Sequence, residues 1–290
     1  GVVLSGFSSR ELYAKGQYSI PSDTACYPAK IMHGHIETLI ERGVDAIFYP
    51  CLTYNFDEGI SDNHYNCPVV AYYSELLNHN MDNLRKTKFM FPYLNINNAH
   101  ELALGLGKCL KTAFGLTIPP FELKRAVNAG YAAYKEWMQD IREEGSRALG
   151  YAQVNEKRVM ILAGRPYHID PEIGHGIDKL ATALGFVVVS EDSIPLSKEP
   201  LDVNVLNQWT YHARLYNAAR YAATHPNVEL VQLVSFGCGV DAITTDEVRA
   251  IMEGHDRLYT QIKIDEITNL GAVTIRLRSL LGAIEADKED

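Results

Sequence analysis

The chain lacks the features that would place it in a membrane, in a secretory pathway or on a nucleic acid. No apolar run approaches the roughly 18 residues that a helix needs to cross a bilayer, and residues 1–9 have neither the basic flank nor the long apolar stretch of a secretion signal. Lys and Arg number 27 against 36 Asp and Glu, and no basic block is present to follow a phosphate backbone. The sequence predicts a cytoplasmic protein with no membrane and no nucleic acid among its partners.

Two nucleotide-binding motifs and a disulfide framework are also missing. Neither the P-loop G-x-x-x-x-G-K-[ST] nor the dinucleotide fingerprint G-x-G-x-x-G occurs, so any associated ATP hydrolysis belongs to a different domain or protein. The chain holds only five cysteines in 290 residues, an odd number in a sequence far larger than small disulfide-dependent scaffolds. Reduced thiols that are able to bind a metal are therefore the relevant cysteine chemistry.

The composition that is present belongs to a packed globular protein. Hydrophobic residues make up 47% and charged residues 22% of the chain, and 290 residues exceed one ordinary domain, so two cores are expected. The chain begins at Gly1 rather than at Met, with a strand-like segment at residues 2–5. Whether it is a piece of a longer polypeptide stays open at this point.

Residues 1–97 are predicted to form a first α/β domain. An amphipathic helix follows Pro28 and ends at Gly43, and the apolar run at residues 45–50 is typical of a strand buried in a parallel sheet. A helix at residues 68–78 and a strand at residues 88–94 complete this unit.

Residues 98–152 are predicted to form a helical connection. Ala, Leu, Lys and Glu dominate this stretch, no strand-like run occurs in it, and Pro119 and Pro120 divide it into two helices.

Residues 153–290 are predicted to form a second α/β domain, because strand and helix patterns alternate along them. The predicted strands cover residues 158–164, 186–190, 228–236 and 259–264, and the predicted helices cover residues 176–184 and 211–224 or begin near residues 244 and 272. The fold class is therefore α/β, with two open parallel-sheet domains (Rossmann-like or flavodoxin-like) joined by a helical connection.

Four cysteines occupy positions that suit metal ligands. Cys51 and Cys238 follow predicted strands, where ligands gather in open α/β sheets, and Cys26 and Cys67 come just before predicted helices. A helix amino terminus favours the thiolate form that binds metal. Because no tight C-x-x-C pair is present, the same positions also suit small buried thiols, and for Cys109 packing is the preferred interpretation.

The loop G-R-P-Y-H-I-D at residues 164–170 follows a predicted strand and carries two candidate substrate-binding residues. Arg165 could bind a carboxylate or phosphate through its forked guanidinium, and His168 could move a proton. Alternatively, Arg165 pairs with a core carboxylate and His168 caps a turn. The sequence leaves both interpretations open, and it names no catalytic residue.

Six ordered motifs resemble a known family. They are P-S-D-T-A-C-Y-P-A-K-I-M-H-G-H, V-D-A-I-F-Y-P-C, Y-N-C-P-V-V, G-R-P-Y-H-I-D, F-G-C-G-V-D-A and I-K-I-D-E-I-T-N-L-G-A. Together they resemble the uncharacterised region of CoA-substrate-specific enzyme activase proteins, which is similar to the subunits of 2-hydroxyacyl-CoA dehydratases. The resemblance extends from about residue 21 to residue 281.

The resemblance implies an iron-sulfur protein. In the dehydratases three cysteines from separate segments hold a [4Fe-4S] cluster, and the matching positions here are Cys26, Cys51 and Cys238, with Cys67 as a candidate fourth ligand. The implied function is a redox component that receives low-potential electrons from an ATP-dependent activase domain or protein.

Two alternatives remain beside that function, and whether the protein is an enzyme stays open. One is a dehydratase-like lyase that acts on an acyl-CoA, and the other is a cluster-free scaffold or sensor module of a large activase. The resemblance also implies pairing of similar subunits, for which a homodimer is one form.

Overall fold

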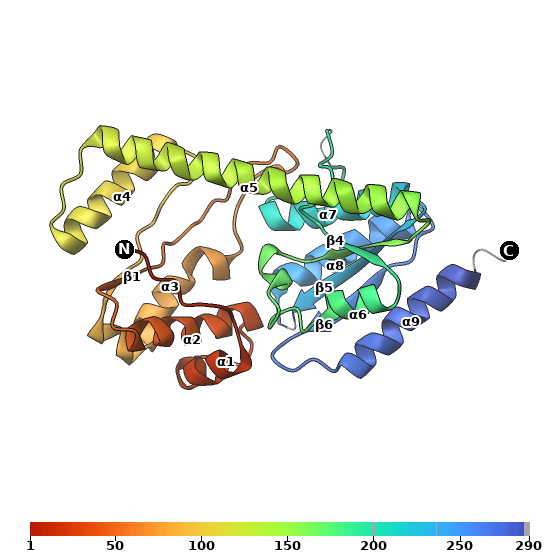
Figure 1. Ribbon diagram of the computed structural model, residues 1–290, viewed down its shortest axis with the longest axis horizontal. Helices are drawn as coiled ribbons and strands as arrows, with labels where there is room; N and C mark the ends of the chain where they lie inside the picture. The colour runs from red at the N-terminus through yellow and green to blue at the C-terminus, as the bar shows by residue number, and fades with distance from the viewer. Residues whose placement is uncertain (199–200, 236, 287–290) are drawn as a thin grey trace. The chain divides into compact units, whose positions relative to one another are not determined.

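The computed structural model shows a mixed α/β chain with two parallel sheets, as the sequence predicts (Figure 1). It describes residues 1–198, 201–235 and 237–286. The chain divides into two compact units. Unit 1 is Gly1–Met138 with Gln208–Thr210, and unit 2 is Gln139–Asn207 with Tyr211–Asp290. Each unit is considered separately below.

Unit 1 contains two short strands and several helices. In chain order these are α1 (Arg10–Gly16), the 3-10 helix η1 (Gln17–Ser19), α2 (Tyr27–Glu41), β1 (Ala46–Phe48), α3 (Pro68–Asn80), η2 (Asp82–Lys86), β2 (Lys88–Met90), α4 (Ala99–Phe114) and the first part of α5 (Pro120–Val154). The helices begin and end at residues suited to caps. Asn98 accepts the backbone N–H groups of the first turn of α4, and Gly115, at a φ of 70°, ends that helix in the left-handed region.

The sheet of unit 1 is a parallel pair, β1 with β2, in which Ile47 lies opposite Phe89. Its core packs residues of α2, α3 and β1 together, among them Ile36, Ile47 and Leu77. The strand predicted at residues 2–5 is wrong. These residues have no regular structure, and the side chains of Val2 and Leu4 are exposed because no neighbouring strand pairs with them.

Residues 98–152 are helical, as predicted, and Pro119 and Pro120 separate α4 from α5. The division between the two compact units falls inside α5, between Met138 and Gln139. The predicted domain boundaries at residues 97 and 152 stay a prediction. Among the described residues, no helix is both long and apolar enough to cross a membrane.

Unit 2 contains a four-stranded parallel sheet with the order β4-β3-β5-β6. Its elements after α5 are β3 (Val159–Ala163), η3 (Pro166–Ile169), α6 (Ile177–Ala183), β4 (Val187–Ser190), α7 (Thr210–Thr224), β5 (Val228–Ser235), α8 (Gly239–Glu253), β6 (Thr260–Ile264) and α9 (Leu270–Ala286). The strand order is that of the flavodoxin-like α/β folds. The last position of the strand predicted at residues 228–236 lies outside the described residues.

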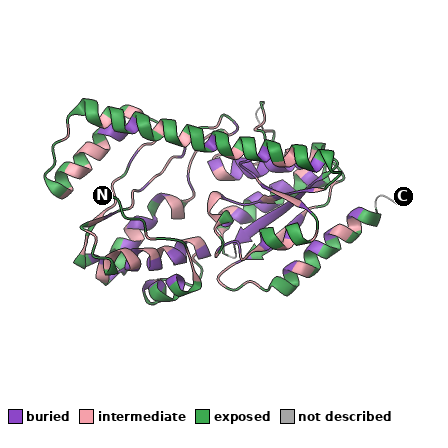
Figure 2. Cartoon of the chain, in the orientation of Figure 1, coloured by how far each residue is buried: buried purple, intermediate pink, exposed green. Residues whose placement is uncertain are grey.

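Helices cover both faces of this sheet. Side chains of α5, α7 and α8 pack with Ile161 and Leu230 in one core, and α6 contacts α9 on the other side. Every residue of the central strand β5 is buried, as expected for a parallel strand covered on both faces (Figure 2). The helix predicted to begin near Thr244 in fact begins at Gly239, because Cys238 caps it five residues earlier than the predicted start.

The topology of unit 2 positions a site. The chain leaves β3 toward β4 on one side and returns to β5 on the other side, so the carboxyl ends of β3 and β5 lie side by side. In open α/β sheets the loops diverge at such a point, and ligands bind there. The loop that begins at Gly164 and the segment that leads into α8 both start at this edge.

Candidate functional site

Three of the four candidate metal ligands belong to unit 1. Cys26 is the N-cap residue of α2, and Cys67 is the N-cap residue of α3, where its sulfur accepts the backbone N–H of Val70 at 3.4 Å. Cys51 comes three residues after β1, and its backbone N–H donates to the carbonyl of Pro92. A proline follows each of the two capping cysteines and fixes the start of its helix.

The charges of these three thiols all act on one phenol, that of Tyr49. Burial, and after it the charges of Cys51, Cys26 and Cys67, together raise the pKa of Tyr49 to about 12. Cys26 and Tyr49 pack against the same hydrophobic core, which is built from residues of α2, α3 and β1, and Cys51 follows β1 in the chain. The fold therefore brings together three cysteines that are separated by 25 and 16 residues in the sequence.

Hydroxyl groups surround the most buried of the three thiols. Cys51 is 1% exposed, and its sulfur lies 3.0 Å from the Oγ of Ser74 on α3. The phenol of Tyr93 donates to Glu75, and its pKa is also affected by Cys51. Hydrogen bonds to a ligating sulfur stabilise its negative charge. The surroundings of Cys51 thus suit a thiolate better than an apolar core would.

The three thiols of unit 1 are donors of the type that binds iron-sulfur clusters. Within the described residues, no three His, Cys, Asp or Glu side chains stand at the spacing that would hold a single metal ion. A cluster binds each thiolate through a different iron, so its ligands need not meet at one point. Ligation of a cluster by Cys26, Cys51 and Cys67 stays a prediction.

The fourth candidate, Cys238, belongs to unit 2, where it is the N-cap residue of α8 and accepts the N–H of Asp241 at 3.4 Å. Burial raises the pKa of Cys238, the charge of Asp241 raises it further, and Arg165 lowers it. This contrasts with the expectation that a helix amino terminus favours the thiolate, because desolvation opposes the charge here.

Arg165 and Asp241 form a buried ion pair at the same edge of unit 2. Both side chains are at most 4% exposed, and both terminal guanidinium nitrogens donate to the carboxylate, Nη2 at 2.9 Å. The carboxylate also accepts the backbone N–H of Ser235 at the end of β5. The pair therefore ties the loop after β3 to the beginning of α8.

His168 closes the loop that Arg165 begins. Its Nδ1 accepts the backbone N–H of Arg165 at 3.0 Å, so the proton of the neutral ring lies on Nε2. Burial and the charge of Arg165 lower the pKa of His168 well below its ordinary value. Gly164 makes room for the ring, because a Cβ there would stand 2.4 Å from Nδ1.

Glu191 lies directly after β4 and is 2% exposed. Burial and the charge of Asp192, opposed in part by Arg214, raise the pKa of Glu191 to about 8. One carboxyl oxygen accepts the backbone N–H of Gly164 at 3.2 Å. At neutral pH this side chain is therefore mostly a neutral acid.

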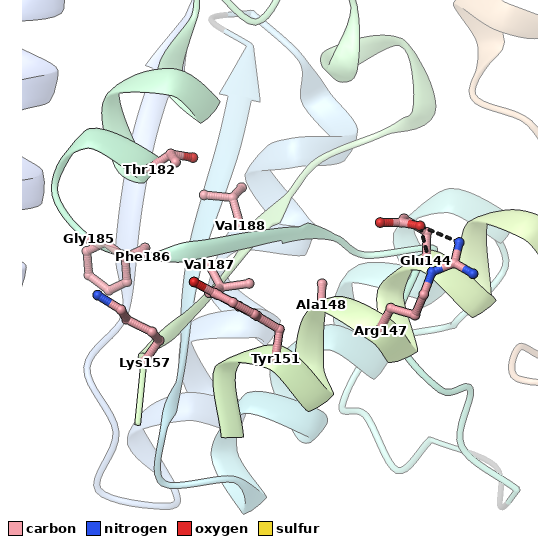
Figure 3. Close-up of a pocket in the computed structure, with 10 residues that line it drawn as sticks. All are labelled: Glu144, Arg147, Ala148, Tyr151, Lys157, Thr182, Gly185, Phe186, Val187 and Val188. Carbon is pink, nitrogen blue, oxygen red and sulfur yellow. Dashed lines mark hydrogen bonds and ion pairs between the residues drawn. The ribbon is translucent and has the colours of Figure 1, made fainter. Parts of the chain in front are cut away.

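Two pockets border the sheet of unit 2. One, of about 210 Å³, is lined by Arg165, His168 and Glu191. The other, of about 530 Å³, lies beside β4, where Figure 3 shows Tyr151, Phe186 and Lys157 around it. The larger pocket carries only ordinary surface groups and an ion pair between Glu144 and Arg147 on α5. The smaller one holds the buried titratable groups and is the candidate binding site.

A family model described as "CoA enzyme activase uncharacterised domain" (DUF2229) matches residues 1–194. The chain belongs to this family. The match covers 194 of the 290 residues and confirms the resemblance predicted from the motifs. It includes all of the unit 1 thiols and ends before Cys238. No curated protein matches the chain.

The residues predicted as a site in this activase-family domain belong to two different units. Cys26, Cys51 and Cys67 gather in unit 1, whereas Cys238 lies in unit 2 with Arg165 and His168. Arg165 pairs with a buried carboxylate and His168 caps its loop, which are the contacts of the second interpretation. Metal ligation and substrate binding by these residues stay predictions.

Sequence reasoning missed several residues of these sites. Asp241 stands inside the motif F-G-C-G-V-D-A, and Glu191 directly follows a predicted strand, so both carried a positional signal. Tyr49 and Ser74 carried none, because only the packing of α3 against β1 places them near the thiols. Cys109, on α4, is half-buried with its pKa raised by burial, which is consistent with a packed thiol.

Proposed function

We propose that this activase-family domain is an iron-sulfur redox component, in which Cys26, Cys51 and Cys67 hold a [4Fe-4S] or related cluster. The observation that carries the proposal is the position of the three thiols: Cys26 and Cys67 are the N-cap residues of α2 and α3, which pack in one core with β1, and Cys51 follows β1. Such a cluster would supply one-electron transfer at low potential.

The protein residues around the thiols have separate roles in this proposal. The N-cap positions direct Cys26 and Cys67 toward the positive ends of α2 and α3, which favours negative charge. Ser74 would donate a hydrogen bond to the sulfur of Cys51. This bond would stabilise the reduced cluster, which carries more negative charge, relative to the oxidised one. Tyr49 is a half-buried phenol that packs against the same core as Cys26.

The proposed electron donor is an ATP-dependent activase domain or protein. The membership in the activase-domain family supports this choice, and the absence of a P-loop from the sequence assigns ATP hydrolysis elsewhere. Cys238 is outside the matched range and in the other unit, so its ligation is a separate question for experiment.

Single cysteine variants test the ligand set. Cys26→Ser, Cys51→Ser and Cys67→Ser should each lower the iron content of protein purified without oxygen. Cys109→Ser is the matched control, because this thiol lies on α4 and should leave the iron content unchanged. Iron retained in all three variants would contradict the proposal. A Cys238→Ser variant in the same series shows whether the fourth cysteine is a ligand.

A further inference from the structure

The pocket of about 210 Å³ in unit 2 has the form of a small-molecule site. Its volume equals that of about seven water-sized groups. Leu162 of β3 and Leu233 of β5 provide an apolar floor, and the polar side chains come from the loop after β3 and from the residue after β4. The pocket lies at the carboxyl end of the sheet, where α/β proteins bind ligands.

Two buried donors in this pocket lack a suitable acceptor. The Nε–H of Arg165 is buried and has no hydrogen-bond partner among the described residues. The Nε2 of His168, which carries the ring proton, faces the Nη2 of Arg165 at 3.5 Å, so two donors stand opposite each other. Buried polar groups are normally paired. An acceptor oxygen bound here would satisfy both residues.

Glu191 supplies a third donor. The Oε2 atom of Glu191 accepts the backbone N–H of Gly164. In the neutral carboxyl group, Oε1 can carry the proton and donate it into the pocket. Asp241 already balances the charge of Arg165, so Lys179 on α6 provides the additional positive charge at the pocket wall. The other charged groups that line the pocket or act on Glu191 are Asp170, Asp178, Asp192 and Arg214.

We propose that this pocket binds a small organic carboxylate. The carboxylate accepts from Arg165, His168 and the protonated Glu191, and an aliphatic body of a few carbons lies on the apolar floor. Charge-assisted hydrogen bonds of this kind are stronger than neutral ones, which favours a carboxylate over an amide of the same shape. No cysteine lines this pocket, so the carboxylate proposal can be tested independently of the iron-sulfur proposal.

Calorimetric titration with isobutyrate, and with isobutyramide as its neutral isostere, tests the ligand class. At about pH 6, below the pKa of Glu191, isobutyrate should bind and isobutyramide should bind at least tenfold more weakly. Equal binding of the two probes, or no binding of isobutyrate to folded protein, overturns the proposal.

The variant Glu191→Gln tests the role of the acid, because the amide keeps a donor but cannot ionise. Isobutyrate affinity of the wild type should fall about tenfold per pH unit above about pH 8, whereas the variant should keep its affinity across that range. Asp178→Asn is the matched control at an exposed position of the same pocket and should keep the wild-type pH profile. A wild-type profile that is flat through pH 8, or a variant that follows the wild type, contradicts the assignment of Glu191.

Discussion

The substitution Asp241→Asn should strongly destabilise unit 2 by leaving the charge of Arg165 buried without its counterion. Both side chains are at most 4% exposed, and the carboxylate accepts two guanidinium bonds and the N–H of Ser235. Removing one partner of a buried ion pair costs about 3–5 kcal/mol, because the remaining charge is not solvated. That cost is a large fraction of the stability of a typical domain.

Hydrogen exchange measured by mass spectrometry reads this loss inside unit 2. Trp137 and Trp209 both belong to unit 1, so tryptophan fluorescence would follow the wrong part of the chain. The slowest amides of β3 and β5 should exchange about two to four orders of magnitude faster in the variant. The control is Asp246→Asn, whose carboxylate is 79% exposed and pairs with Arg249 on the surface of α8. Equal exchange in wild type, variant and control would refute the assignment of Arg165 and Asp241 as a structural pair.

Three further predictions concern the same two sites. Between about pH 4.5 and pH 8 the folded state keeps Glu191 protonated while the unfolded state ionises it, so the free energy of unfolding of the wild type should fall by about 5 kcal/mol as pH rises through this window. Urea titrations should show that the Glu191→Gln variant lacks this pH-dependent component. Parallel pH profiles of the wild type and the variant would contradict the prediction. Gly164→Ala should lower stability by about 1–3 kcal/mol because its Cβ would collide with the His168 ring, whereas Gly150→Ala on α5, with no atom within 4 Å of the new Cβ, should be neutral or stabilising by thermal denaturation. In protein freed of iron, alkylation followed by mass spectrometry should find Cys51, at 1% exposure, slower to react than Cys26 and Cys67, and equal rates for these three thiols would contradict its burial.

Much of unit 2 was predictable from the sequence because its strands are short apolar runs between clear helices. The run R-V-M-I-L-A-G became β3 and the apolar stretch after Gly185 became β4, each within a residue or two of the predicted bounds. Parallel strands that are covered on both faces need continuous apolar residues, and few other structures produce such runs. The segment at residues 2–5 has the same apolar character but no partner, and a strand requires pairing that sequence pattern alone does not report.

The candidate sites were predictable in position more than in contacts. A residue that follows a strand, such as Cys51 or Arg165, must lie at the carboxyl edge of its sheet, and the structure places both there. The partner of Arg165 was not predictable, because Asp241 is 76 residues away and meets it only when β5 pairs with β3. The placement of Cys26, Cys51 and Cys67 around the core of α2, α3 and β1 likewise depends on tertiary packing rather than on spacing.

The iron and acid-labile sulfide content of protein prepared without oxygen tests the central claim most directly. The account predicts about four irons and four sulfides per chain, with visible absorption that bleaches on reduction. Their absence after attempted reconstitution of a folded chain would contradict the iron-sulfur assignment.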